Sequence, residues 1–152
     1  MIKLVRTDSN HKDFIKLVDA LNSYLKIIDG DEHDFYSQYN NIDVLKHVVI
    51  AYKNNTPVGC GAFKSYDIKA VEIKRMFTKT EERGIGIASK ILLELEKWAH
   101  ELSYKTCVLE TGKRQVEAVS FYKKMGYSII PNYGQYKNID NSLCFKKALL
   151  FP

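Results

Sequence analysis

Two glycines in the middle of the chain stand where a predicted strand gives way to a predicted helix. The segment reads Met76-Phe77-Thr78-Lys79-Thr80-Glu81-Glu82-Arg83-Gly84-Ile85-Gly86-Ile87-Ala88-Ser89. Glycines at the start of a helix let the backbone approach a ligand closely. The first N–H groups of a helix have no acceptor within it, and the helix dipole is positive at that end. With the multi-donor guanidinium of Arg83 beside it, this turn is predicted to bind a diphosphate.

Two common phosphate-binding motifs do not fit this turn. A P-loop requires the pattern G-x-x-x-x-G-K-[ST], which the chain does not contain. A dinucleotide-binding fingerprint requires G-x-G-x-x-G, and here the third glycine is replaced by Ser89. The strands before the turn also have the pattern of hairpins rather than of a strand–helix–strand unit.

A third motif does fit, and a second one accompanies it. The run Arg83-Gly84-Ile85-Gly86-Ile87-Ala88 resembles the [Q/R]-x-x-G-x-[G/A] motif of the GCN5-related N-acetyltransferase (GNAT) family. The segment Gln115–Tyr127 resembles that family's signature N-x-x-A-x-x-[F/L]-Y-x-[K/R]-x-G-[F/Y], with Gln115 where the family usually has Asn. The matching positions are Ala118, Phe121, Tyr122, Lys124, Gly126 and Tyr127. The resemblance covers roughly Val48 to Leu149.

This resemblance implies that acetyl-CoA is bound as the acyl donor and that no metal is needed. The backbone around Met76–Thr78 would pair with the pantetheine arm, and an N–H near Phe77 would stabilise the oxyanion. Tyr122 would lie near the sulfur of CoA and protonate the departing thiolate. The alternative for Tyr122 is an aromatic packed on an amphipathic helix. The residues expected to bind acetyl-CoA are Met76, Phe77, Thr78, Arg83, Gly84, Ile85, Gly86, Ile87, Ala88, Ser89, Gln115, Ala118 and Tyr122.

Two carboxylates are candidates for the group that takes a proton from the amine. Glu72 stands six residues before Thr78, and several relatives have a Glu at that place that acts as a general base, often through water. A carboxylate suits this role when burial raises its pKa. The alternative is a surface ion pair between Glu72 and Lys74 or Arg75. Glu110 is a second candidate base.

In this family the acceptor is recognised by the first two helices, their loop and the last two strands, which here means residues 27–40 and 131–142. The first segment is rich in Asp and Glu, and both segments contain tyrosines. Such a mixture suits a cationic amine, although solvated loops would have the same composition. The candidate acceptor residues are His33, Tyr36, Glu110 and Tyr133. A free amino acid, a small polyamine and a peptide N-terminus all remain open.

The elements that would position these residues follow from periodicity and turn residues. Predicted strands cover residues 2–6, 47–53, 58–66, 70–78, 105–110, 127–130 and 142–149. Predicted helices run from a cap at Thr7, Asp8 or Ser9 to about Ile28, and over residues 33–40, 84–102 and 115–125. The order β-α-α-β-β-β-α-β-α-β-β predicts an α/β protein with a mixed sheet, as in the GNAT-like acyl-CoA N-acyltransferase fold.

Composition narrows the remaining classes. The 152 residues fit a single domain over 1–152. A formal charge of +5 permits an anionic partner, but the basic residues are scattered, which argues against a nucleic-acid-binding domain. Three widely spaced cysteines and four histidines without ligand spacing indicate a reduced, metal-free, cytoplasmic protein. The chain contains no apolar run long enough to span a membrane, and it could assemble as a homodimer.

The sequence therefore predicts an acetyl-CoA-dependent N-acetyltransferase. A primary amine of a small molecule or peptide would attack the thioester directly in a ternary complex. A ping-pong route through cysteine is disfavoured, because no Cys lies next to a recognisable base. The alternative is a non-catalytic acyl-CoA-binding regulatory module on the same fold.

Overall fold

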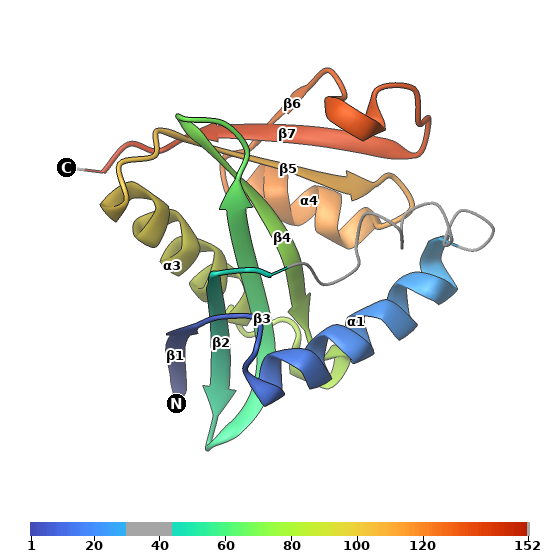
Figure 1. Ribbon diagram of the computed structural model, residues 1–152. Helices are drawn as coiled ribbons and strands as arrows, with labels where there is room; N and C mark the ends of the chain where they lie inside the picture. The colour runs from blue at the N-terminus through green and yellow to red at the C-terminus, as the bar shows by residue number, and fades with distance from the viewer. Residues whose placement is uncertain (30–43, 152) are drawn as a thin grey trace.

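A seven-stranded mixed sheet with helices on both faces makes up residues 1–29 and 44–151, the part of the chain that the computed structural model describes (Figure 1). The strands are β1 (Ile2–Thr7), β2 (His47–Lys53), β3 (Thr56–Ser65), β4 (Ala70–Thr78), β5 (Thr106–Gly112), β6 (Ser128–Ile130) and β7 (Ser142–Ala148). The helices are α1 (Lys12–Asp29), α3 (Ile87–Glu101) and α4 (Val116–Lys124), with the short 3-10 helices η2 (Thr80–Glu82) and η3 (Gly134–Tyr136).

This order confirms the predicted α/β class, and the predicted helix over residues 33–40 lies outside the described residues. The long helix was predicted to begin at Gly84, but α3 begins at Ile87. The reason is local, since Gly84 and Gly86 have φ values of 87° and 85°, which a right-handed helix cannot contain. The turn before β3 is likewise shorter than predicted, because Asn54 and Asn55 make it alone with positive φ values.

The strand order β1-β2-β3-β4-β5-β7-β6 places one parallel pair, β4 and β5, at the centre of the sheet. Their pairing covers Ala70 with Thr106, Val71 with Cys107 and Glu72 with Val108, and it ends there. From Ile73 onward β4 keeps its partners in β3 only, while β5 continues against β7. The backbone edge of β4 beyond Glu72 therefore has no partner in β5.

A β-bulge in β4 changes which face its side chains meet. Lys74 pairs with Ala62 and Phe77 pairs with Cys60, so Arg75 and Met76 stand together opposite Gly61. Arg75 has a φ of 60°, a conformation that non-glycine residues adopt rarely. Because one extra residue reverses the alternation of a strand, Phe77 packs on the α1 side of the sheet and Met76 on the opposite side.

The two faces of the sheet have separate hydrophobic clusters. The apolar stripe of α3 packs with residues of α4 and with one face of the central strands, in a cluster that includes Ile91, Leu95 and Phe145. The stripe of α1 packs on the other face, where Phe14, Leu17 and Leu21 are buried. Figure 1 shows α1 crossing in front of β3 and β4, with its C-terminal end directed towards α4. Within residues 1–29 and 44–151, no helix combines the length and the apolar character that crossing a membrane requires.

Candidate active site

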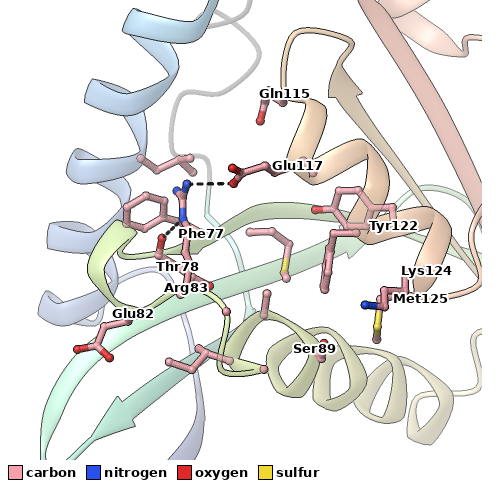
Figure 2. Close-up of a pocket in the computed structure, with 18 of the residues that line it drawn as sticks. Phe77, Thr78, Glu82, Arg83, Ser89, Gln115, Glu117, Tyr122, Lys124 and Met125 are labelled. Carbon is pink, nitrogen blue, oxygen red and sulfur yellow. Dashed lines mark hydrogen bonds and ion pairs between the residues drawn. The ribbon is translucent and has the colours of Figure 1, made fainter.

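A cavity of about 510 Å³ lies where α1, the end of β4, the glycine turn and α4 meet. Figure 2 shows side chains from these separate elements converging on it. This cavity is the larger of two that adjoin each other. Most of the residues predicted to bind acetyl-CoA line it: Met76, Phe77, Thr78, Arg83, Gly84, Gly86, Ile87, Ala88, Ser89, Gln115, Ala118 and Tyr122. Ile85 differs, because it is not part of the lining and its side chain is largely exposed.

The glycine turn is defined by backbone conformation rather than by crowding. A Cβ atom added at Gly84 or Gly86 would meet no atom within 4 Å. Glycine is therefore needed at these positions for the positive φ values and not for space. Gly86 is the N-cap of α3 and supplies no side-chain acceptor. The first N–H groups of α3 consequently open towards the larger cavity with the positive end of the helix dipole, which suits an anion.

Arg83 connects three elements at the edge of the larger cavity. Its Nε donates to the carbonyl oxygen of Thr78 at 3.0 Å, and its Nη1 lies 3.8 Å from Oε2 of Glu117 in α4 (Figure 2). The guanidinium also stacks over the ring of Tyr24 in α1, 4.8 Å from the ring centre. These contacts place a multi-donor cation next to the start of α3, where the sequence predicted it.

Tyr122 lies where the larger cavity meets a second one. The smaller cavity has a volume of about 110 Å³ and shares Leu21, Met76, Gln115, Ala118 and Tyr122 with the larger cavity. Burial raises the pKa of Tyr122 above its ordinary value, and the charge of Glu110 raises it further. The phenol therefore keeps its proton at neutral pH, as a general acid must. Its ring also packs against three other aromatic side chains, so the alternative prediction, an aromatic packed on a helix, describes Tyr122 as well.

Both candidate carboxylates line the smaller cavity. Glu72 is only 4% exposed, and its Oε2 accepts a hydrogen bond from the hydroxyl of Tyr133 at 2.7 Å. Its Oε1 lies 4.0 Å from Nζ of both Lys64 and Lys74, so the predicted pairing with Lys74 is present, although the site is buried rather than on the surface. Oε2 of Glu110 accepts a hydrogen bond from the hydroxyl of Ser142 at 2.7 Å.

The loop between β6 and β7 brings Tyr133 to this site. Asn132 donates to the carbonyl oxygens of Tyr136, Ile139 and Ser142, which fixes the loop from within. Burial, followed by the charge of Glu72, raises the pKa of Tyr133, so its hydroxyl stays a donor to that carboxylate. Tyr133 was predicted as an acceptor residue, and the structure places it behind Glu72 rather than in the cavity lining. His33 and Tyr36 lie outside the described residues.

Tyr24, Glu117, Lys74 and Arg75 are among the cavity residues that the sequence did not assign to the site. Tyr24 follows Leu21 by three residues and so continues the apolar stripe of α1. This spacing is the sequence signal that could have identified it. Glu117 meets Arg83 only through the tertiary fold. Lys74 and Arg75 were considered only as partners of Glu72, yet both line the smaller cavity. The sequence gives no sign of the bulge at Arg75, because a positive φ is usually indicated by Gly or Asn and this position has neither.

The cavities suit organic ligands, and the described residues contain no group of three or more His, Cys, Asp or Glu side chains that could hold a metal. The arrangement offers an anion site at a helix start, a protonated phenol at the junction of two cavities, and two carboxylates beyond it.

Comparison with known proteins agrees with this arrangement. Residues 14–127 match the Acetyltransferase (GNAT) family. The chain is 32% identical over 140 residues to the IAA acetyltransferase of Azospirillum brasilense, covering 89% of this chain and 90% of that protein. An uncharacterized N-acetyltransferase of Bacillus subtilis is 29% identical over 101 residues, covering 65% of this chain and 67% of that protein.

Solved structures share the fold. A GNAT family acetyltransferase from Elizabethkingia anophelis with acetyl-CoA bound has a TM-score of 0.71 at 19% identity, covering 97% of this chain and 98% of that chain. The PaiA N-acetyltransferase from Thermoplasma acidophilum in complex with coenzyme A has a TM-score of 0.69 at 18% identity, covering 97% and 99%. With its fold, its paired cavities and its sequence matches in agreement, this chain belongs to the GNAT family and is an N-acetyltransferase.

Proposed function

We propose that this enzyme holds acetyl-CoA in the larger cavity and transfers the acetyl group to a primary amine bound in the smaller one. One observation carries the proposal: the two cavities share the residues around Tyr122, so a thioester in one and an amine in the other would meet at a protonated phenol. The structural neighbours with acetyl-CoA or coenzyme A bound support the choice of donor.

The residues of the larger cavity fit such a donor. The start of α3 and the guanidinium of Arg83 would hold the diphosphate. The unpaired edge of β4 beyond Glu72 would pair with the amide groups of the pantetheine arm, in the manner of an added strand. The apolar side chains of Met76, Phe121 and Met125 would cover the rest of the arm. Ile85 contributes its backbone to the turn, since its side chain faces away from the lining.

The chemistry we propose is a direct transfer. Acetyl-CoA supplies an activated thioester, and the neutral amine attacks its carbonyl carbon, so a C–N bond forms and the C–S bond breaks. A backbone N–H near Phe77 stabilises the oxyanion. Tyr122 gives its proton to the departing sulfur, Glu72 takes one from the amine nitrogen, and a proton then returns from Glu72 to Tyr122 through water. The products are an N-acetyl amine and free CoA.

Glu72 suits the role of proton acceptor because the hydroxyl of Tyr133 fixes its orientation at 2.7 Å. A second candidate has an observation of its own, since Glu110 is the carboxylate whose charge acts on Tyr122. Holding two reactants in adjacent cavities also removes much of the entropic barrier to their reaction.

Substitution at the start of α3 tests the donor site. Ser89→Glu puts a carboxylate into the lining of the larger cavity, whereas Lys90→Glu makes a larger change of net charge on the exposed neighbouring residue. We expect calorimetry to detect acetyl-CoA binding by the wild type and by Lys90→Glu, and none by Ser89→Glu. Equal binding by both variants would refute a diphosphate site at this turn.

A non-catalytic acyl-CoA-binding module would bind acetyl-CoA in the same way, so binding alone does not establish catalysis. The enzyme should release free CoA when amines are added, and a thiol-release assay over amino acids, polyamines, aminoglycosides and peptides measures this. Binding without amine-dependent thiol release across that range would favour the module.

A further inference from the structure

The smaller cavity is lined by equal numbers of positive and negative side chains, most of them little exposed to solvent. Among the described residues, its charged lining consists of two carboxylates, Glu72 and Glu110, and two cations, Lys74 and Arg75. Glu72 is 4% exposed, Arg75 is 6% exposed and the side chain of Lys74 is 9% exposed. Charges removed from water in this way are stable only beside opposite charges. The lining therefore presents both signs of charge to a ligand that enters the cavity.

The bulge in β4 explains why the cations face this cavity. Glu72 and Lys74 lie on one face of the strand by simple alternation. Arg75 would ordinarily point to the other face, but its φ of 60° at the bulge brings it into the same lining. A strained conformation at a buried cation beside a reaction site indicates a functional constraint rather than an accident of folding.

From these charges we infer that the acceptor is a small amine that also bears a carboxylate, as an α-amino acid does. This inference rests on the proposed function and specifies its substrate class. The carboxylate of the acceptor would lie against Lys74 and Arg75, with its amino group towards Glu72 and Tyr122. Nζ of Lys74 and Oε1 of Glu72 are 4.0 Å apart, a spacing comparable to the short distance between the two charged groups of an α-amino acid.

Two further properties agree with a small zwitterion. The smaller cavity, at about 110 Å³, is a fraction of the size of the larger one, which disfavours long polyamines and aminoglycosides. Burial also lowers the pKa of Lys74, with Glu72 acting in the opposite direction. A bound carboxylate would stabilise the charged form of this lysine, and this stabilisation would contribute to the binding free energy.

The test compares acceptors that differ only in the carboxylate. Leucine and isoamylamine form one pair, phenylalanine and phenethylamine another, and each amino acid amide adds a third member without a free carboxylate. We expect the amino acid of at least one pair to be acetylated with a kcat/KM at least tenfold above that of its decarboxylated amine, as measured by thiol release. Equal or faster acetylation of the decarboxylated amines would overturn the inference and favour a cationic acceptor.

The chain supplies a matched control for the role of Lys74. Lys64 and Lys74 both lie 4.0 Å from Oε1 of Glu72, but Lys64 is exposed and does not line the smaller cavity. Lys74→Met should raise KM for the amino acid at least tenfold and abolish the preference over the amine, and Lys74→Arg should restore part of it. Lys64→Met should change neither, and equal effects of both methionine variants would refute a carboxylate site at Lys74.

Failure of this inference can be distinguished from failure of the proposed function. If the wild type does not bind acetyl-CoA, the proposed function itself is refuted. Two outcomes would refute only the zwitterionic acceptor. In the first, the enzyme binds acetyl-CoA and acetylates amines whether or not they have a carboxylate. In the second, it binds acetyl-CoA but acetylates no member of these series.

Discussion

The proposed chemistry depends most on Tyr122. Among the residues that the structure describes, it is the one that has a raised pKa and lines both cavities, where a departing sulfur and an incoming amine would meet. Its aromatic packing and its proposed acid role depend on the same burial. The surrounding rings exclude water, and that desolvation keeps the phenol protonated. The two interpretations that the sequence left open for this residue are therefore compatible.

Tyr122→Phe removes the proton donor and leaves the ring packing in place. We expect turnover to fall about 100-fold, the lower range for the loss of a general acid, while acetyl-CoA affinity stays within about twofold in calorimetry. Tyr66→Phe is the matched control, since Tyr66 is 45% exposed and lines neither cavity. Turnover of Tyr122→Phe equal to that of the control would remove this phenol from the mechanism.

Glutamine substitutions separate the two carboxylates. Glu72→Gln keeps the shape of the side chain but cannot take a proton, so kcat should fall about 100-fold near pH 7. The deficit should shrink as the pH rises, because hydroxide can then take the proton that leaves the attacking nitrogen. Glu110→Gln should affect kcat less and leave the shape of the pH–rate profile unchanged. The reverse pattern in the two pH–rate profiles would assign the proton-accepting role to Glu110.

At the scale of elements, the active site results from two interruptions of regular structure. The β4–β5 ladder stops after Glu72, which leaves the strand edge that we propose pairs with the pantetheine arm. The β-bulge at Arg75 and Met76 then reverses the alternation of β4 beside that edge. The helix α3 begins directly after the turn that follows β4, so the donors at its start face the same space.

The conformation of the glycine turn gives a prediction about stability. Because a Cβ at Gly86 would meet nothing, the effect of substitution should follow backbone preference rather than side-chain size. Gly86→Ala should lower the free energy of unfolding by about 1 kcal/mol. Gly86→Asn should lower it less, since Asn tolerates left-handed backbone better than Ala.

Chemical denaturation of the two Gly86 variants measures this difference directly. A larger loss for Asn than for Ala would mean that space, and not the φ of 85°, selects glycine here.

At the scale of the whole molecule, the sheet separates two hydrophobic clusters, and each of them contains a buried cysteine. Cys60 and Cys107 are both fully buried, on opposite faces of the sheet. Burial raises the pKa of each thiol to about 12 from the ordinary 9.0. These thiols are therefore uncharged at physiological pH and belong to the core.

The raised thiol pKa values predict a loss of stability in alkali. A folded-state pKa above the unfolded value means that the unfolded chain loses protons first, so stability is intact below pH 9 and declines as the pH rises from 9 towards 12. The decline should be on the order of a few kcal/mol by pH 11, given about 1.4 kcal/mol per pKa unit for each thiol. Denaturation midpoints at pH 7, 9, 10 and 11 measure it. Cys60→Ala should show a shallower decline, and an unchanged slope would contradict this account.

How much the sequence predicted differs between the elements and the site. Periodicity located β2, β4 and the apolar stripe of α3, because alternation and helical spacing are local properties. The positive φ of Gly84 and Gly86 moved the start of α3 by three residues, since a pattern of apolar residues does not specify where backbone conformation changes. The second predicted helix, the single-domain extent and the roles of the individual site residues stay predictions.

The sequence by itself determined the family and located the glycine turn, because both depend on residues that are neighbours along the chain. The tertiary structure decided the partnerships between distant residues, such as Arg83 with Tyr24 and Glu117, and Tyr133 with Glu72. It also decided that Lys74 and Arg75 line the smaller cavity. The physical reason is that burial and charge pairing depend on which segments the sheet brings together, and no local spacing records that.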